Sequence, residues 1–136
     1  MTALQSPLAL LGRILLAFLF VPAGFGKIAG FSGSVGYATA MGLPLPTLGV
    51  AAALVIELVG GLMLLVGFGT RIAALALALF TVVAAIFFHA YWALPADQAM
   101  MQQLMFNKNM GITGGLLAFA AFGAGSWSVD GRHKAA

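Results

Sequence analysis

Four long apolar runs divide the sequence, and short polar or glycine-rich stretches separate them. About 20 apolar residues in a helix cross a hydrocarbon core about 30 Å thick. The runs are continuous and rich in Ala and Leu, and backbone within lipid has to satisfy its own hydrogen bonds, which favours helices. We predict an all-α fold, a transmembrane four-helix bundle that forms one integral membrane domain over residues 1–136, with spans at about 8–26, 48–68, 72–90 and 106–124.

The connections between the runs differ in length. The GFGTR turn at residues 67–71 is tight and predicts an antiparallel hairpin of the second and third spans. In the long first connection, Ser32 is placed to cap a short helix that reaches Met41, and the glycine and prolines after it end that helix. The third connection contains ADQAMMQQLMF, whose Met and Leu positions form the apolar face of another short helix. We expect both short helices to lie at the membrane interface.

The first run is predicted to be a retained helix. A cleaved signal peptide has a basic segment ahead of its apolar stretch, which this chain lacks, and Arg13 lies inside the run itself. Four spans place both termini on one side of the membrane. That side holds more of the basic residues (Arg71, Arg132 and Lys134, with Arg13 nearby, against Lys27 and Lys108). We therefore predict a multi-pass protein with both termini in the cytoplasm.

Composition supports a membrane protein and excludes several other classes. Hydrophobic residues make up 62% of the chain and charged residues 7%, whereas average globular domains are about 25% charged. The net charge of +3 is small and scattered, so lipid is the expected partner and nucleic acid is not. The chain has no cysteine, which excludes disulfides, thiolate metal sites and dithiol chemistry carried by its own side chains.

Glu57 lies near the middle of the second apolar run. Small residues border it at helical spacing, so its face of the helix should contact a neighbouring helix instead of lipid. The fourth run carries a similar pair, and we predict helix packing through both sets: Gly49, Ala53, Gly60, Gly61, Gly111 and Gly115.

A carboxylate near the bilayer centre needs a cation or a proton to be tolerated. Arg13, one and a half turns into the first span, is the preferred partner of Glu57, and Lys27 at the other end of that span is the alternative. The pair has two readings: it sets the register of two helices, or it belongs to a ligand, quinone-headgroup or proton site. We favour the second, because ionisable residues inside membranes commonly mark functional sites.

Other polar residues gather at the outer ends of the spans. We predict an outer polar mouth formed by Lys27, His89, Asn107 and Lys108. Histidine exchanges protons near neutral pH, which suits His89 to a proton site. The alternatives are a His89 bonded to a backbone carbonyl, and lysines that contact lipid headgroups. His133 in the tail is expected to be solvated.

Several cofactor sites do not fit this pattern. A haem held by two facing histidines is not expected, because His89 is the one histidine in a span. Glu57 and His89 differ too much in depth to share a metal ion, so no metal site is predicted. The chain has no P-loop, GxSxG or HExxH motif, and the glycines at residues 24–33 are read as a turn.

Motifs occur along most of the chain, from Gly12 to Asp130: GRILLAFLFVPAGFGKIAGF, IELVGGLMLLVGFGTRIAA, FFHAYW, FNKN and the closing GAGSWSVDG. As a set they resemble the DoxX family of small bacterial membrane proteins. The resemblance implies a four-helix protein of the inner membrane, commonly labelled an oxidoreductase. The family takes its name from a component associated with archaeal quinol-oxidising and thiosulfate:quinone systems. Some relatives form complexes with redox enzymes, and more distant eukaryotic relatives look like cargo receptors.

These observations lead to two hypotheses for function. The first is an accessory or subunit of quinone-linked oxidoreductase metabolism, and the second is a non-enzymatic membrane scaffold or small-solute conduit. No intrinsic cofactor is evident, so an oxidoreductase role requires a bound quinone, a flavin or a redox partner protein. The small-residue faces suit contacts within one chain or between copies of it, so the sequence leaves open whether the chain forms a homo-oligomer.

Overall fold

A computed structural model describes residues 3–133, and within them the chain folds entirely into helices and their connections. In chain order these are α1 (Gln5–Ala29), α2 (Phe31–Ala40), α3 (Pro46–Val55), the π-helical turn η1 (Ile56–Gly60), α4 (Gly61–Val66), α5 (Thr70–Phe88), the 3-10 turn η2 (Tyr91–Ala93), α6 (Ala96–Phe122) and α7 (Val129–His133). Lys134 and the side chain of His133, both used in the sequence argument, lie outside the described residues.

Within residues 3–133, three helical segments are long and apolar enough to cross a membrane: Gln5–Ala29, Pro46–Val66 and Thr70–Ala93. They match the first three predicted spans. The second is continuous through α3, η1 and α4. α6 has 27 residues but starts with the polar sequence ADQAMMQQ and does not reach the same hydropathy. The prediction of four spans is therefore confirmed for the first three segments.

The two predicted interfacial helices have different outcomes. The first corresponds to α2, but Gly30 is its N-cap and no side chain caps it, so the predicted capping role of Ser32 is wrong. The second is not a separate helix, because its residues form the first turns of α6. No glycine or proline interrupts residues 96–110, and Ala, Gln, Met and Leu are good helix formers, so the helix continues without a break.

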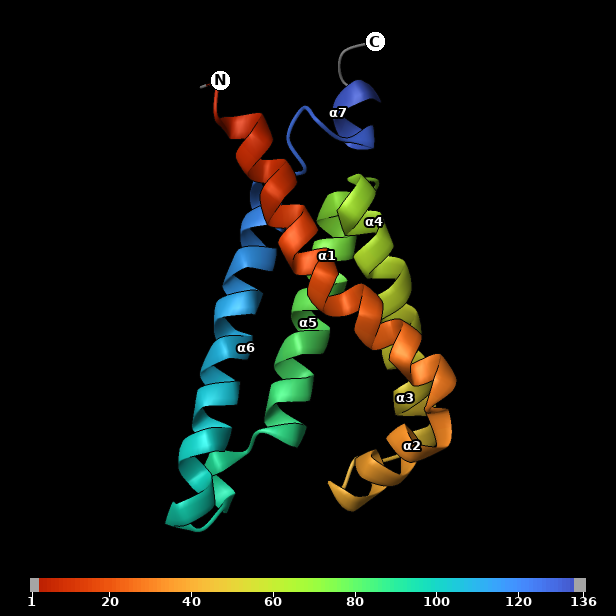
Figure 1. Ribbon diagram of the computed structural model, residues 1–136, viewed down its shortest axis with the longest axis vertical. Helices are drawn as coiled ribbons and strands as arrows, with labels where there is room; N and C mark the ends of the chain where they lie inside the picture. The colour runs from red at the N-terminus through yellow and green to blue at the C-terminus, as the bar shows by residue number, and fades with distance from the viewer. Residues whose placement is uncertain (1–2, 134–136) are drawn as a thin grey trace.

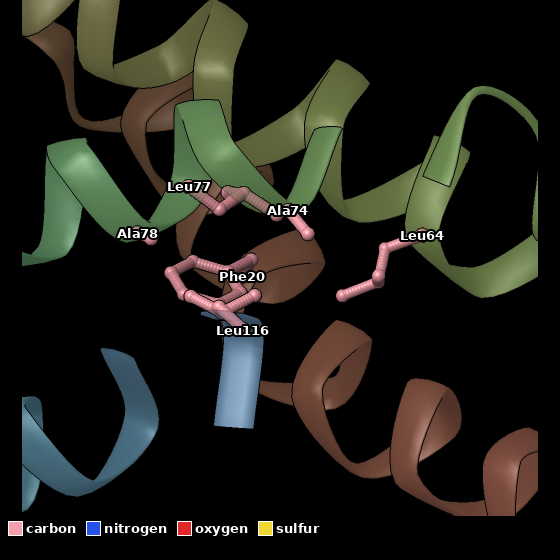
Figure 2. Close-up of a cluster of buried hydrophobic side chains, with 6 residues drawn as sticks. All are labelled: Phe20, Leu64, Ala74, Leu77, Ala78 and Leu116. Atoms are coloured by element: carbon pink, nitrogen blue, oxygen red, sulfur yellow. The ribbon is translucent and has the colours of Figure 1, made fainter. Parts of the chain in front are cut away.

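The helices pack around one small apolar core. Figure 1 shows α5 and α6 side by side and antiparallel, with α1 crossing the bundle diagonally and packing on the segment 46–66. The start of α1 and α7 lie at one end of the molecule, and α2 and the start of α6 lie at the other. In Figure 2 Phe20 of α1 lies among the other core residues, which are Leu64, Ala74, Leu77, Ala78 and Leu116.

Glycines allow α1 to approach the second span closely. A Cβ at Gly24 would lie 2.9 Å from the backbone nitrogen of Leu58, and one at Gly61 would lie 3.3 Å from the backbone nitrogen of Val21. Real Cβ atoms need more room, so larger residues would separate the backbones. Gly24 therefore lies inside α1 and contributes to this crossing, so the predicted turn at residues 24–33 is wrong at this position.

The other small residues predicted near Glu57 have different neighbours. Gly60 lies against Leu77 of α5, where an added Cβ would be 3.2 Å from Leu77 Cγ. Gly49 lies against Leu43 of the preceding connection, where an added Cβ would be 2.7 Å from Leu43 Cδ2. Ala53 lines a cleft described below.

The predicted packing through Gly111 and Gly115 differs from the structure. A Cβ added at either position would meet no atom within 4 Å. α6 instead buries Thr113 and Leu116, which lie on a different face of the helix. Small residues permit close helix packing but do not require it, and within one chain this glycine face stays open.

Candidate ligand-binding site

A cleft of about 1020 Å³ lies between α1, α2, the second span and α5, and Asn109 of α6 also reaches it. This volume is at the upper end of the range typical for small-molecule sites, roughly 300–1,000 Å³. Most of the residues that line it are apolar or aromatic. The polar exceptions come from several helices: Lys27, Ser34, Glu57, Thr81, His89 and Asn109.

Lys27 and Glu57 form a direct ion pair inside this cleft, with 2.6 Å between Nζ and Oε2. The Glu57 side chain is 8% exposed and that of Lys27 is 24% exposed. Both charges face each other among apolar side chains, where a single unpaired charge would be costly. The pair thus offers a hydrogen-bond donor and an acceptor side by side in otherwise apolar surroundings.

Local structure explains how the two charges meet. Lys27 lies in the last turn of α1, where the helix dipole favours a cation. It follows Gly24 by one turn, and Gly24 lies against Leu58, the neighbour of Glu57. Glu57 itself lies in the π-helical turn η1. Such turns are frequent at functional sites.

The structure therefore corrects the preferred partner of Glu57 from Arg13 to Lys27. α1 and the second span run antiparallel, with Val21 against Gly61. Arg13 lies about two turns from Val21 toward the start of α1. That displacement brings Arg13 level with the end of α4, on the far side of Gly61 from Glu57.

Arg13 is fully buried at that end of the bundle and bonds to backbone carbonyls. Its Nη1 donates to the carbonyl oxygen of Leu65 at 2.8 Å, and its Nη2 donates to that of Trp127. Asp130 is close enough to interact electrostatically with the guanidinium. We call Arg13, these two carbonyls and Asp130 the Arg13 anchor, because it joins α1, α4 and the closing segment, which is GAGSWSVDG at residues 123–131.

The closing segment also binds the turn before α5. The carboxylate of Asp130 accepts hydrogen bonds from the backbone nitrogens of Gly69, at 2.8 Å, and Thr70, at 2.9 Å. The backbone nitrogen of Asp130 donates to the carbonyl of Gly67 at 2.8 Å. These bonds satisfy N–H groups that the first turn of a helix leaves without intrahelical partners. This role of Asp130 was not predicted from the GAGSWSVDG motif in which it lies.

Gly67 is required where the anchor meets this turn. Its φ is +71°, a left-handed conformation that favours glycine. An added Cβ would lie 2.6 Å from Nη1 of Arg13 and closer still to Cβ of Ser128. The GFGTR turn and the closing segment therefore fit together around Arg13.

The predicted outer mouth is assembled only in part. Lys27 and His89 line the cleft, whereas Asn107 and Lys108 lie on the exposed face of α6 and do not. Asn109 takes their place. His89 Nδ1 lies 2.8 Å from Oε1 of Gln102, so its partner is a side chain and not the backbone carbonyl considered above.

Metal ligands do not cluster in residues 3–133: no three His, Asp or Glu side chains come close enough to hold an ion. The chemistry that the cleft offers is hydrogen bonding. An ammonium group donates, a carboxylate accepts, and the Asn109 amide can do both.

Comparison with known proteins supports the family suggested by the motifs. The DoxX family model matches residues 8–90, which is more than half of the chain. The chain belongs to the DoxX family. It is 42% identical over 132 residues to inner membrane protein YqjF of Escherichia coli K12, covering 96% of this chain and 95% of that protein. It is 34% identical over 130 residues to inner membrane protein YphA of the same organism, covering 96% and 93%. No solved structure matches the chain.

The family match includes Lys27, Glu57 and His89 and ends before α6 begins. The two Escherichia coli relatives align over nearly their whole length, so α6 and the closing segment lie within the aligned region. Together with the three apolar helices, these findings establish a DoxX-family membrane protein.

Proposed function

We propose that this DoxX-family protein is an inner-membrane accessory or subunit of quinone-linked redox metabolism, and that its cleft holds a quinone headgroup against Lys27 and Glu57. The observation that carries the proposal is the 2.6 Å ion pair inside an apolar cleft. Ligand sites commonly combine apolar walls with a few polar groups that orient the ligand.

The residues of the cleft fit such a headgroup. The oxidised ring has carbonyl oxygens that accept hydrogen bonds, and the reduced ring has hydroxyls that donate them. Lys27 supplies a donor and Glu57 an acceptor, so the pair can hold either form. The bound quinone would supply the redox chemistry, with electrons from a partner redox protein. Apolar side chains such as Phe80 and Val83 would contact the ring and tail.

The proposal includes a topology with four membrane crossings. α6 lies antiparallel along α5, so a membrane that surrounds α5 also surrounds much of α6. Both ends of the described chain then lie on one side, with Arg71 and Arg132. The positive-inside rule makes that side cytoplasmic. The names of both Escherichia coli relatives support an inner-membrane location.

Purification from native membranes in a mild detergent tests this proposal. Mass spectrometry of the lipid extract should identify a quinone bound to the wild type, and protein mass spectrometry should identify a redox partner. The matched control is the Lys27→Met/Glu57→Gln variant, which removes both charges and keeps side chains of similar size. Wild-type protein that retains only phospholipid and no redox partner would instead favour the scaffold or solute-conduit hypothesis.

A further inference from the structure

We infer that the cleft opens sideways into the hydrocarbon of the bilayer, so that its ligand enters from the lipid phase and not from water. The inference rests on the proposed role of the cleft as the ligand site. It identifies the ligand class as a lipid-dissolved molecule with a hydrogen-bonding headgroup.

The rim of the cleft carries exposed apolar side chains. Leu19 of α1 is 46% exposed, and Leu79 and Val83 of α5 are 68% and 41% exposed, while all three also line the cleft. Leu79 lies near the middle of α5, and Leu19 lies well inside α1. In a membrane-spanning helix these positions face the hydrocarbon. The opening between them is therefore at the depth of the acyl chains.

The end of the cleft near α2 has a different construction. Tyr37 of α2 and Phe88 at the end of α5 stack with their ring centroids 5.5 Å apart and the planes 13° from parallel. Both rings line the cleft. This contact joins two helices that Figure 1 shows well apart along most of their length. We assign the ring pair as the closure between the cleft and the polar side of the membrane.

The two ends together determine what can bind. A water-borne solute that enters at that end meets the stacked rings, of which Tyr37 is 56% exposed, and a molecule dissolved in lipid passes Leu79 and Val83. Inside the cleft, this molecule meets Lys27 and Glu57, which can form hydrogen bonds with a headgroup that accepts or donates them. Phospholipid headgroups stay at the interface, so they do not suit an ion pair reached through the hydrocarbon.

Single-cysteine spin labelling can test the route directly, because the chain contains no cysteine of its own. Ala53→Cys places a nitroxide on the wall of the cleft. Its accessibility to oxygen, which concentrates in lipid, and to a water-soluble nickel chelate is measured by power saturation in liposomes. Phe18→Cys, on an exposed apolar position of α1, is the lipid reference, and Asp97→Cys in the first turn of α6 is the water reference.

We expect the Ala53→Cys label to resemble the lipid reference, with oxygen accessibility several-fold above nickel accessibility. Adding Tyr37→Ala should raise nickel accessibility several-fold at Ala53→Cys and leave Phe18→Cys unchanged. A label at Ala53→Cys that is as accessible to nickel as Asp97→Cys in the otherwise wild-type chain would overturn the inference, and so would an unchanged value after Tyr37→Ala. These measurements need no quinone, so a lipid-open cleft without bound quinone would contradict the proposed function alone.

Discussion

In the described part of the chain, two buried charged sites differ in how their charges are satisfied. Arg13 is enclosed at one end of the bundle, where backbone carbonyls from α4 and the closing segment accept its hydrogen bonds. Lys27 and Glu57 satisfy each other and also line a cleft large enough for a ligand. A ligand has no access to the first site and direct access to the second. A buried charge in a membrane protein is therefore not by itself a functional site. Whether a ligand can reach the charge determines whether it can serve as one.

The comparison also separates two uses of a polar group in an apolar fold. The Arg13 anchor joins segments that are far apart in the sequence, so its value is structural. The ion pair joins two neighbouring helices that already pack through Gly24 and Gly61. Its charges contribute less to the assembly of the fold, which leaves them available to contact a bound molecule.

The largest effect should come from Arg13→Leu. It leaves the carbonyls of Leu65 and Trp127 without their donor and removes a positive charge near Asp130, at a cost of about 4 kcal/mol. Thermal unfolding in detergent should show a large loss of stability, and limited proteolysis should release the closing segment. Arg71→Leu is the matched control, because the exposed Arg71 makes a single 3.3 Å bond to the carbonyl of Ala120. Equal losses from both substitutions would contradict a special role for the Arg13 anchor.

Glu57→Leu should have the next largest effect on stability. It leaves the Lys27 ammonium in the cleft without its carboxylate, and breaking a buried pair costs roughly 3 kcal/mol. Removing both charges in Lys27→Met/Glu57→Gln should restore most of the stability in the same unfolding assay. No comparable rescue is expected when Asp130→Asn is added to Arg13→Leu, because the backbone carbonyls remain unsatisfied. Failure of the double variant to recover would show that the ion pair is needed for folding.

Gly67→Ala should destabilise the protein by about 2 kcal/mol through its left-handed conformation alone, before any contact with Arg13. The helical and open position Gly111 is the control, where Ala should be neutral or stabilising by up to about 1 kcal/mol. Differential scanning fluorimetry in detergent can rank the two variants. If Gly67→Ala were as stable as Gly111→Ala, the fit of the turn around Arg13 would be wrong.

Asp130→Asn should give the smallest loss. Asn keeps one oxygen that can accept from the backbone nitrogen of Gly69 or Thr70 but loses the negative charge near Arg13, and losing such a cap costs about 1 kcal/mol. Hydrogen exchange should show faster exchange confined to the first turn of α5. Asp97→Asn, at an exposed position of α6, should leave that turn unchanged.

Much of the fold follows from features that the sequence displays locally. Three spans could be predicted because their apolar runs have the length of the hydrocarbon core. The turn before α5 could be predicted because the sequence has two glycines there, and both adopt a positive φ in the structure. α6 was divided incorrectly. Its polar first half was taken as a separate interfacial helix, although helix continuity depends on the absence of breaking residues and not on hydropathy.

The site was harder to predict because it depends on how helices cross. The importance of Glu57 follows from its position in an apolar run, but its partner depends on the contact of Gly24 with Leu58 and on the π-helical turn. Neither can be derived from helical periodicity. The stacking of Tyr37 on Phe88 likewise joins residues that no local pattern relates.

The most direct test of the central claim is equilibrium binding of a quinone to protein stripped of ligand in liposomes. The wild type should bind saturably, and Lys27→Met/Glu57→Gln should bind at least about tenfold more weakly, a loss of about 1.4 kcal/mol, at nearly the same melting temperature. Equal affinity in the two proteins, or no saturable binding to the wild type, would contradict the account of Lys27 and Glu57 as the headgroup site.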